Sequence, residues 1–209
     1  ISPIDFIPVY EKSGLISRLD RYIWEQAAAK LGEWKKAGIN MSISVNISPK
    51  DFYYIDIFNT FAGLIKKYDI EPSNLKIEIT ETTIMSDVPN LMGELEELRK
   101  AGFTLEMDDF GSGYSSLNTL KDINVDVLKV DMGFIKETKN VKKSRIILAS
   151  VIKMAKELNL LIITEGVETE EQVDNLTKLG CDVFQGYYFS KAIDVNEFEK
   201  RYLYRKKAG

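Results

Sequence analysis

Acidic and amide side chains, together with one lysine, recur at the ends of short apolar runs. The residues placed in this way are Asn46, Glu78, Asp108, Asp109, Lys129 and Glu165. Asp108 and Asp109 are adjacent, and neighbouring carboxylates repel each other unless a cation lies between them or one of them is protonated. Glu78 and Lys129 are embedded in apolar sequence, where an unpaired charge would be costly. Together these side chains suit one or two divalent cations, with the lysine directing an anionic substrate or a water nucleophile.

An isolated acidic residue that follows a strand has a simpler explanation, because it often caps the next helix. We interpret Asp87, Glu170, Glu171 and Asp194 as helix N-caps of this kind. The converging group described above is harder to explain by capping. We therefore favour a functional site over a set of structural salt bridges.

The composition narrows the chemistry that such a site could perform. The 209 residues include no histidine and one cysteine, Cys181. The absence of histidine excludes Ser-His-Asp and Cys-His nucleophilic catalysis and His-ligated zinc. One cysteine excludes an intrachain disulfide and a cysteine-cluster metal site, and it fits the reducing conditions of the cytoplasm.

Charge and length limit the class of protein further. The chain has 28 Lys and Arg against 32 Asp and Glu, a net charge of −4. This balance argues against a nucleic-acid or membrane-surface partner, which would need a basic face. No apolar run approaches the roughly 20 residues that a bilayer span needs. We expect one domain over residues 1–209, with no membrane insertion in this segment.

The elements that must position these residues alternate between strand and helix. We predict strands at Ser42–Asn46, Leu75–Thr80, Thr104–Asp108, Val127–Val130, Leu161–Thr164 and Asp182–Gln185. We predict helices at Ser17–Ala37, Asn90–Ala101, Val141–Leu158 and Thr169–Gly180. Ser17 with Asp20, and Thr169 with Gln172, occupy positions typical of a capping box.

Alternating strands and helices predict a parallel sheet. Six strand ends carry polar residues, and in a closed barrel all such ends meet at one rim, where active sites are built. In an open sheet they would converge only at a switch point. We therefore expect a TIM-like (β/α)₈ barrel of which this chain holds six strands, with two more upstream of Ile1. Because six strands leave two edges unpaired, we expect the isolated chain to dimerise, exchange segments or be marginally stable.

A glycine-rich turn follows the aspartate pair, over residues Asp109–Ser116. Its glycines permit positive φ and close backbone approach, and Ser115 or Ser116 can cap the next helix. An ordinary tight turn would have the same composition. Its position directly after the aspartates favours a loop that organises a metal or gates a substrate.

These motifs, in this order, resemble the EAL domain family, whose members hydrolyse the bacterial second messenger cyclic di-GMP. The resemblance extends from Ile1 to about Glu199. The matching segments are Pro3–Pro8, Val45–Ser48, Glu78–Glu81, Asp108–Ser116, Leu128–Asp131, Glu165–Glu168 and Gln185–Tyr187.

The resemblance implies a role for each matching residue. The metal ligands for two Mg²⁺ or Mn²⁺ ions would be Asn46, Glu78, Asp108, Asp109 and Glu165. Lys129 would orient or help to activate the attacking water, and Glu165 is the other candidate for that role. Glu168, counted with the catalytic residues, would hold the loop after Asp109 and so couple it to metal binding. Substrate would contact Gln185, Asp109 and Lys129, and the supporting residues around them would be Glu81, Ser112 and Asp131.

The implied reaction is the hydrolysis of one phosphodiester bond of cyclic di-GMP to give linear pGpG. The Glu-Ala-Leu motif that names the family precedes Pro3 in family members and is not in this chain, so one metal-ligating Glu is expected upstream, unless the protein is a truncated relative. Family members are often preceded by sensory or GGDEF-type diguanylate cyclase domains. The resemblance thus implies cyclic di-GMP and such upstream domains as partners, and the open sheet edges expected above favour a homodimer.

Two other functions stay open. The chain could bind cyclic di-GMP or dock a partner protein without hydrolysis. It could also be a different metal-assisted barrel enzyme, such as an enolase-like proton abstractor with Lys129 as the base.

Overall fold

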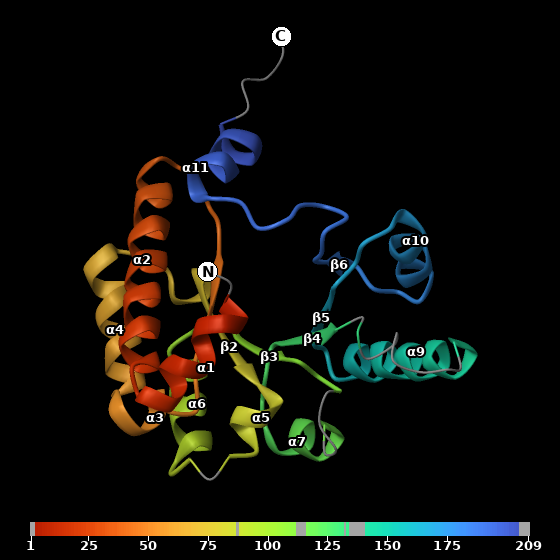
Figure 1. Ribbon diagram of the computed structural model, residues 1–209, viewed down its shortest axis with the longest axis horizontal. Coiled ribbons are helices and arrows are strands. Elements are labelled where there is room, and N and C mark those ends of the chain that lie inside the picture. Colours follow the sequence, from red (N-terminus) through yellow and green to blue (C-terminus); the bar gives the residue numbers. More distant parts are fainter. Residues whose placement is uncertain (1–2, 87, 112–115, 132, 134–140, 205–209) are drawn as a thin grey trace.

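The computed structural model describes residues 3–86, 88–111, 116–131, 133 and 141–204. Six parallel strands form one sheet in the order of the sequence, and the sheet curls into a half-barrel (Figure 1). The strands are β1 (Ile43–Asn46), β2 (Leu75–Thr80), β3 (Leu105–Asp108), β4 (Val127–Asp131), β5 (Leu161–Glu165) and β6 (Val183–Phe184). In this part of the chain β1 and β6 each pair with one neighbour, so both edges of the sheet are open.

Helices connect the strands and cover the convex face of the sheet. The main ones are α1 (Pro3–Ser13), α2 (Ile16–Lys36), α4 (Ile57–Tyr68), α6 (Leu91–Lys100), α7 (Ser116–Asp122), α9 (Val141–Glu157) and α10 (Glu170–Lys178). Shorter turns of helix are α3 (Asp51–Tyr54), α5 (Glu81–Ile84), α11 (Val195–Phe198), η1 (Pro72–Asn74) and η2 (Glu199–Leu203). In Figure 1, α2 and α4 lie side by side at one end of the sheet and α9 and α10 lie at the other.

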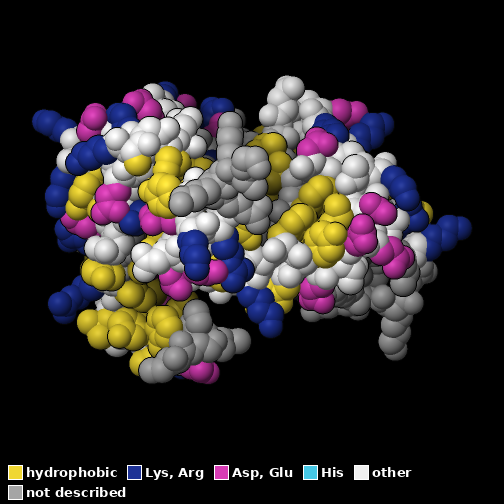
Figure 2. Space-filling model, turned by 90° about the horizontal axis from the view of Figure 1, so that it is seen from above, with side chains coloured by type: hydrophobic (Ala, Val, Ile, Leu, Met, Phe, Trp, Pro, Cys, Tyr) yellow, Lys and Arg dark blue, Asp and Glu magenta, His cyan; other side chains and the backbone are white. Residues whose placement is uncertain are grey.

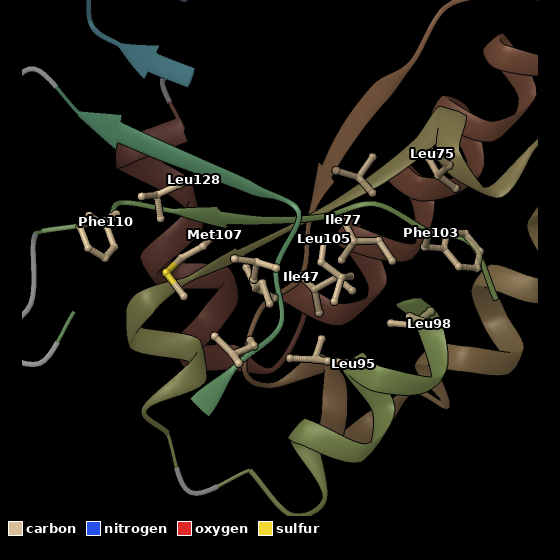
Figure 3. Packing of buried hydrophobic residues seen from close by; sticks show 14 of the residues in the cluster. Ile47, Leu75, Ile77, Leu95, Leu98, Phe103, Leu105, Met107, Phe110 and Leu128 are labelled. Atoms are coloured by element: carbon tan, nitrogen blue, oxygen red, sulfur yellow. The ribbon is translucent and has the colours of Figure 1, made fainter. Parts of the chain in front are cut away.

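Side chains alternate between the two faces of the sheet along each strand, and the outer face is apolar whereas the inner face is polar. On β2, Leu75, Ile77 and Ile79 are fully buried in the core, so the residue that follows each of them points to the opposite face. Figure 3 shows Ile77 and Leu105 of adjacent strands packed above Leu95 and Leu98 of α6. Burial of this outer face holds the strands in place, and the inner face is left for polar groups.

The predicted elements agree closely with the structure. All six strands are confirmed, each with boundaries within one residue of the prediction, and all six are parallel. The capping box of Thr169 and Gln172 at the start of α10 is confirmed. The predicted barrel is confirmed as a half-barrel of six strands.

Some predicted helix caps are wrong. Helix α2 begins at Ile16, and Ser17 is a buried residue inside its first turn because the amide of Leu19 already bonds to the carbonyl of Leu15. Glu170 and Glu171 are first-turn residues of α10 and not N-caps, since Thr169 takes that position. Asp194 does cap α11. Asp87, Ser112 and Ser115 lie outside the described residues.

The surface shows charges of both signs. In Figure 2 basic and acidic side chains are interspersed over the visible face, and hydrophobic side chains gather in separate clusters between them. Mixed charges of this kind create a weak field at a distance. None of the helices in the described ranges combines the length and the apolar character needed to cross a membrane.

Candidate functional site

Four inner-face side chains from four strands meet at the carboxyl ends of the sheet. The Lys129 Nζ atom of β4 lies 2.9 Å from Glu78 Oε1 on β2 and 3.5 Å from Asp108 Oδ1 on β3. The same nitrogen lies 2.8 Å from Glu165 Oε1 on β5. We call these four residues the lysine-centred cluster. The sequence predicted that they would converge, and the structure brings them together.

Burial sets the electrostatics of this cluster. The side chain of Lys129 is only 5% exposed. Burial by itself would lower the pKa of Lys129, but the carboxylates of Glu165 and Glu78 outweigh it and hold that pKa above its usual value. Burial also raises the pKa of Glu78 and of Glu165, and Lys129 offsets part of that rise. Lys129 is therefore a firmly protonated ammonium and a hydrogen-bond donor.

Asp109 adds a further carboxyl to the same rim. Its backbone is left-handed, with φ of 56°, and its amide donates to Asp108 Oδ1 over 2.9 Å. Burial and the nearby Asp108 raise the pKa of Asp109. The next amide, of Phe110, donates to the carbonyl of Lys129 over 3.2 Å, which ties the start of the glycine-rich turn to β4.

Asn46 ends β1 at the open edge of the sheet and is exposed. Its carbonyl accepts a hydrogen bond of 2.9 Å from Nε1 of Trp24, which is fully buried. Asn46 lines a cavity of about 660 Å³ together with Thr80, Asp108 and Asp109. The opposite wall of this cavity comes from α1 and α2. Asn46 thus shares a cavity with both aspartates of the rim. In the register of β1 and β2, Asn46 is the partner of Glu78.

Gln185 follows β6, and its backbone is held on both sides. Its amide donates to the carbonyl of Thr164 over 2.8 Å and its carbonyl accepts from Val167 over 3.1 Å. At Gly186 a Cβ would lie 2.1 Å from the carbonyl oxygen of Val167, so only glycine fits there. Gln185 is exposed at the end of the sheet next to β5.

The remaining predicted residues surround this rim. Glu81 is 1% exposed at the first position of α5, and Thr80 caps that helix. Asp131 ends β4 opposite Glu165, and its carboxylate accepts a hydrogen bond from the amide of Gly133. Glu168 is exposed before α10, where its amide donates to Gln172. The contact expected between Glu168 and the loop after Asp109, and the role of Ser112, fall on residues that the structure does not describe.

Two charged pairs were missed by the sequence analysis. Asp20 of α2 faces Asp51 of α3, which is fully buried. Lys76 and Glu106 form an ion pair of 3.0 Å on the inner face of β2 and β3. The sequence indicates that Lys76 and Glu106 lie on the inner face, because each is two positions before a predicted site residue on the same strand, but it does not indicate that the two residues pair. The first pair joins residues on separate helices, and no spacing rule reveals it.

The donor set fits divalent cations by its charge and chemistry. Four carboxyl groups, of Glu78, Asp108, Asp109 and Glu165, face one ammonium, so negative charge is in excess. Carboxylate oxygens are the ligands that Mg²⁺ and Mn²⁺ prefer. Among the described residues no three acidic side chains adopt a geometry that would enclose a metal ion. Three of the carboxylates are instead directed at Lys129.

The fold and this rim define an α/β-barrel type of protein with an acidic site at the carboxyl ends of its strands. Comparison with known proteins identifies the family. The profile of the EAL domain matches residues 1–192, and the chain belongs to that family. The chain is 34% identical over 198 residues to the bifunctional diguanylate cyclase/cyclic di-GMP phosphodiesterase MucR of Pseudomonas aeruginosa. That match covers 94% of this chain and 29% of MucR. The chain spans a third or less of the length of several curated relatives.

Two solved structures share the fold at similar identity. The PaMucR phosphodiesterase in complex with c-di-GMP superimposes with a TM-score of 0.87 at 34% identity, covering 95% of this chain and 81% of that one. A manganese and cy-diGMP complex of Klebsiella pneumoniae BlrP1 superimposes with a TM-score of 0.73 at 29% identity, covering 84% and 44%. Relatives of this chain therefore bind cyclic di-GMP, and one of them was solved with manganese.

Proposed function

We propose that the full-length protein carrying this chain hydrolyses cyclic di-GMP to linear pGpG and requires Mg²⁺ or Mn²⁺. One observation carries the proposal: three acidic side chains from three strands converge on Lys129 at the carboxyl ends of the sheet. The phosphodiesterase activity of the relatives supports it.

The residues that would hold the ions are Asn46, Glu78, Asp108, Asp109 and Glu165. When bound, Mg²⁺ or Mn²⁺ would neutralise the phosphoryl oxygens and lower the pKa of a water molecule. The excess of negative charge in the lysine-centred cluster is what such ions would balance. With these carboxylates engaged as ligands, the Lys129 ammonium would be available to bind the phosphate.

Lys129 and Glu165 would have distinct roles in this reaction. A general base needs a pKa near the working pH. The surroundings of Lys129 raise its pKa, so Lys129 donates hydrogen bonds to a phosphoryl oxygen or to water and does not take up a proton. Glu165, whose pKa is raised by burial, is the better proton acceptor. The same argument disfavours an enolase-like reaction with Lys129 as the base.

The other predicted roles follow from position. Gln185 would contact substrate from the end of β6, and Asp109 would do so from the rim beside Asp108. Glu168 would hold the loop after Asp109, with Glu81, Ser112 and Asp131 as supporting residues. Sensory or GGDEF-type domains upstream and a homodimer complete the proposal.

The test is turnover by the full-length protein. Purified protein is incubated with cyclic di-GMP and Mg²⁺ or Mn²⁺, and the products are separated by chromatography. We expect linear pGpG to accumulate, EDTA to stop the reaction, and added metal to restore it. A folded protein that leaves cyclic di-GMP intact with either metal would contradict the proposal.

A second function is binding without hydrolysis. The observation that favours it is that no acidic trio in the described part of the chain has a geometry that would enclose a metal ion. Titration calorimetry with cyclic di-GMP, with and without metal, separates the two functions. Tight binding without product supports a receptor, and metal-dependent product supports the enzyme.

A further inference from the structure

A second layer of charge lies beneath the lysine-centred cluster. On β2, Lys76 precedes Glu78 by two residues, and on β3, Glu106 precedes Asp108 by two residues. Side chains two apart on a strand share a face, so Lys76 and Glu106 point to the same inner face as the site residues. Their side chains are 22% and 1% exposed, which places Glu106 deeper than the three carboxylates of the lysine-centred cluster.

Glu106 lies directly beside Glu78. The two residues are partners in the parallel register of β2 and β3, so two carboxylates are neighbours on the inner face. The charge of Glu106 is one of the factors that raise the pKa of Glu78. Glu106 is not left unpaired, because Lys76 Nζ donates a hydrogen bond of 3.0 Å to its Oε1. Lys76 therefore pairs across the strands with Glu106, and it does not pair along its own strand with Glu78.

A lysine in this position has a choice of partner. Its ammonium is carried by a flexible chain of four methylene groups, long enough to reach a neighbour two residues along the strand. Glu78 is the next carboxylate on that face of β2. A Glu78 carboxylate paired with both Lys76 and Lys129 would have its negative charge balanced twice over, and it would be a poor ligand for a cation.

We propose that Glu106 is a positioning residue that holds Lys76 away from Glu78 and so keeps Glu78 available to a divalent cation. The inference rests on the proposed function in one respect, which is that Glu78 is a metal ligand. It assigns to Lys76 and Glu106 a role in setting metal affinity, beyond the stability that a buried ion pair would give.

The test compares metal binding by variants of the full-length protein. Mn²⁺ is titrated by calorimetry and by electron paramagnetic resonance into the wild-type protein, E106Q and the double variant K76M/E106Q. We expect E106Q to weaken Mn²⁺ binding by about ten- to a hundredfold, the range known for groups that support metal ligands. The double variant, which lacks the competing ammonium, recovers most of that affinity.

The matched control is E33Q. It makes the same substitution in the exposed Lys30–Glu33 pair on α2, and it should leave Mn²⁺ affinity unchanged. If E106Q fails to fold, E106D tests the same point, because a shorter carboxylate holds Lys76 less closely while keeping the charge. A purely structural role for Glu106 predicts no recovery in the double variant, and that result would overturn the proposal.

A crystal structure of metal-free E106Q gives an independent answer. We expect Lys76 Nζ within ion-pair distance of Glu78, and a Lys76 that stays beside the substituted amide on β3 would contradict the proposal. If the wild-type protein binds no Mn²⁺, the proposed function is wrong. The position of Lys76 in the E106Q crystal would still show whether Glu106 holds Lys76 away from Glu78.

Discussion

Two groups of buried carboxyl side chains in this molecule compensate for the loss of hydration in different ways. In the lysine-centred cluster, Glu78 and Glu165 lie within 3 Å of an ammonium. Between α2 and α3, Asp20 and Asp51 face each other, and burial together with the charge of Asp51 raises the pKa of Asp20 to about 8. Burial also raises the pKa of Asp51. The first group keeps its charge by pairing, and the second keeps a proton.

The difference shows what each group can do. A carboxylate that is paired with a lysine remains an anion and can exchange the lysine for a metal ion. A carboxyl that retains a proton is a poor ligand, and it makes stability depend on pH instead. The loop after β1 contacts both groups, since Asn46 lines one cavity with Asp20 and Asp108, and the amide of Ser48 donates to Asp51 over 2.7 Å.

The largest effect should come from Lys129→Met, which removes the ammonium that the carboxylates of the first group share. We expect turnover of cyclic di-GMP to fall by about 10²- to 10³-fold, because the donor to the phosphate is lost. Initial rates of pGpG formation measure this. Lys178→Met on the exposed face of α10 is the matched control and should keep full activity. Turnover by Lys129→Met at the wild-type rate would remove Lys129 from the mechanism.

Metal binding should stabilise the first group only. At a Mn²⁺ concentration about a hundredfold above its dissociation constant, the free energy of unfolding should rise by about 2.7 kcal/mol. Urea denaturation with Mn²⁺ and then with EDTA measures the difference. In a Glu78→Gln variant the rise should shrink, whereas Asp20→Asn should leave it unchanged. An equal loss in both variants would mean that the two groups do not differ as described.

Asp20→Asn should change the pH dependence of stability. The folded chain holds a proton on Asp20 that the unfolded chain releases above the ordinary pKa of 3.8, so the free energy of unfolding falls as the pH rises from there to about 8. Asparagine needs no proton, and the variant should lose less stability over that range. Urea midpoints from about pH 5 to pH 8.5 test this. Asp174→Asn, at an exposed position on α10, should retain the wild-type profile.

The smallest effect on the site should come from Trp24→Phe, at the buried residue of α2 that donates to the carbonyl of Asn46. The substitution removes this hydrogen bond and leaves space in the core, so it should cost more stability than the about 0.5–1.5 kcal/mol of the hydrogen bond alone. Thermal denaturation measures the loss. A Trp34→Phe variant, which removes a bond from Nε1 to Glu199 far from the site, gives the comparison. Only Trp24→Phe should also weaken Mn²⁺ binding.

Much of the fold and part of the site could be predicted from sequence, because both depend on local patterns. The alternation in Leu75–Thr80 fixes which face of β2 is buried, and a parallel sheet then brings Glu78, Asp108 and Lys129 to one rim. The capping box at Thr169 is also a local signal. These features need no knowledge of how distant elements pack.

The features that could not be predicted from sequence depend on how distant elements pack against one another. The Asp20–Asp51 pair joins α2 to α3, and Ser17, which looks like a cap, is buried there in the first turn of α2. The partner of Lys76 could not be chosen from sequence, because Glu78 along the strand and Glu106 across it both satisfy the spacing. Which of two carboxylates a flexible lysine selects depends on the register between strands.

The close approach at Gly186 has a mechanical consequence. The backbones at Gly186 and Val167 are in contact without a side chain between them, and hydrogen bonds join Gln185 to both Thr164 and Val167. The two segments are therefore locked against sliding. Any displacement of this end of the sheet that keeps these bonds would therefore carry Gln185 together with the segment from Thr164 to Val167, which includes Glu165.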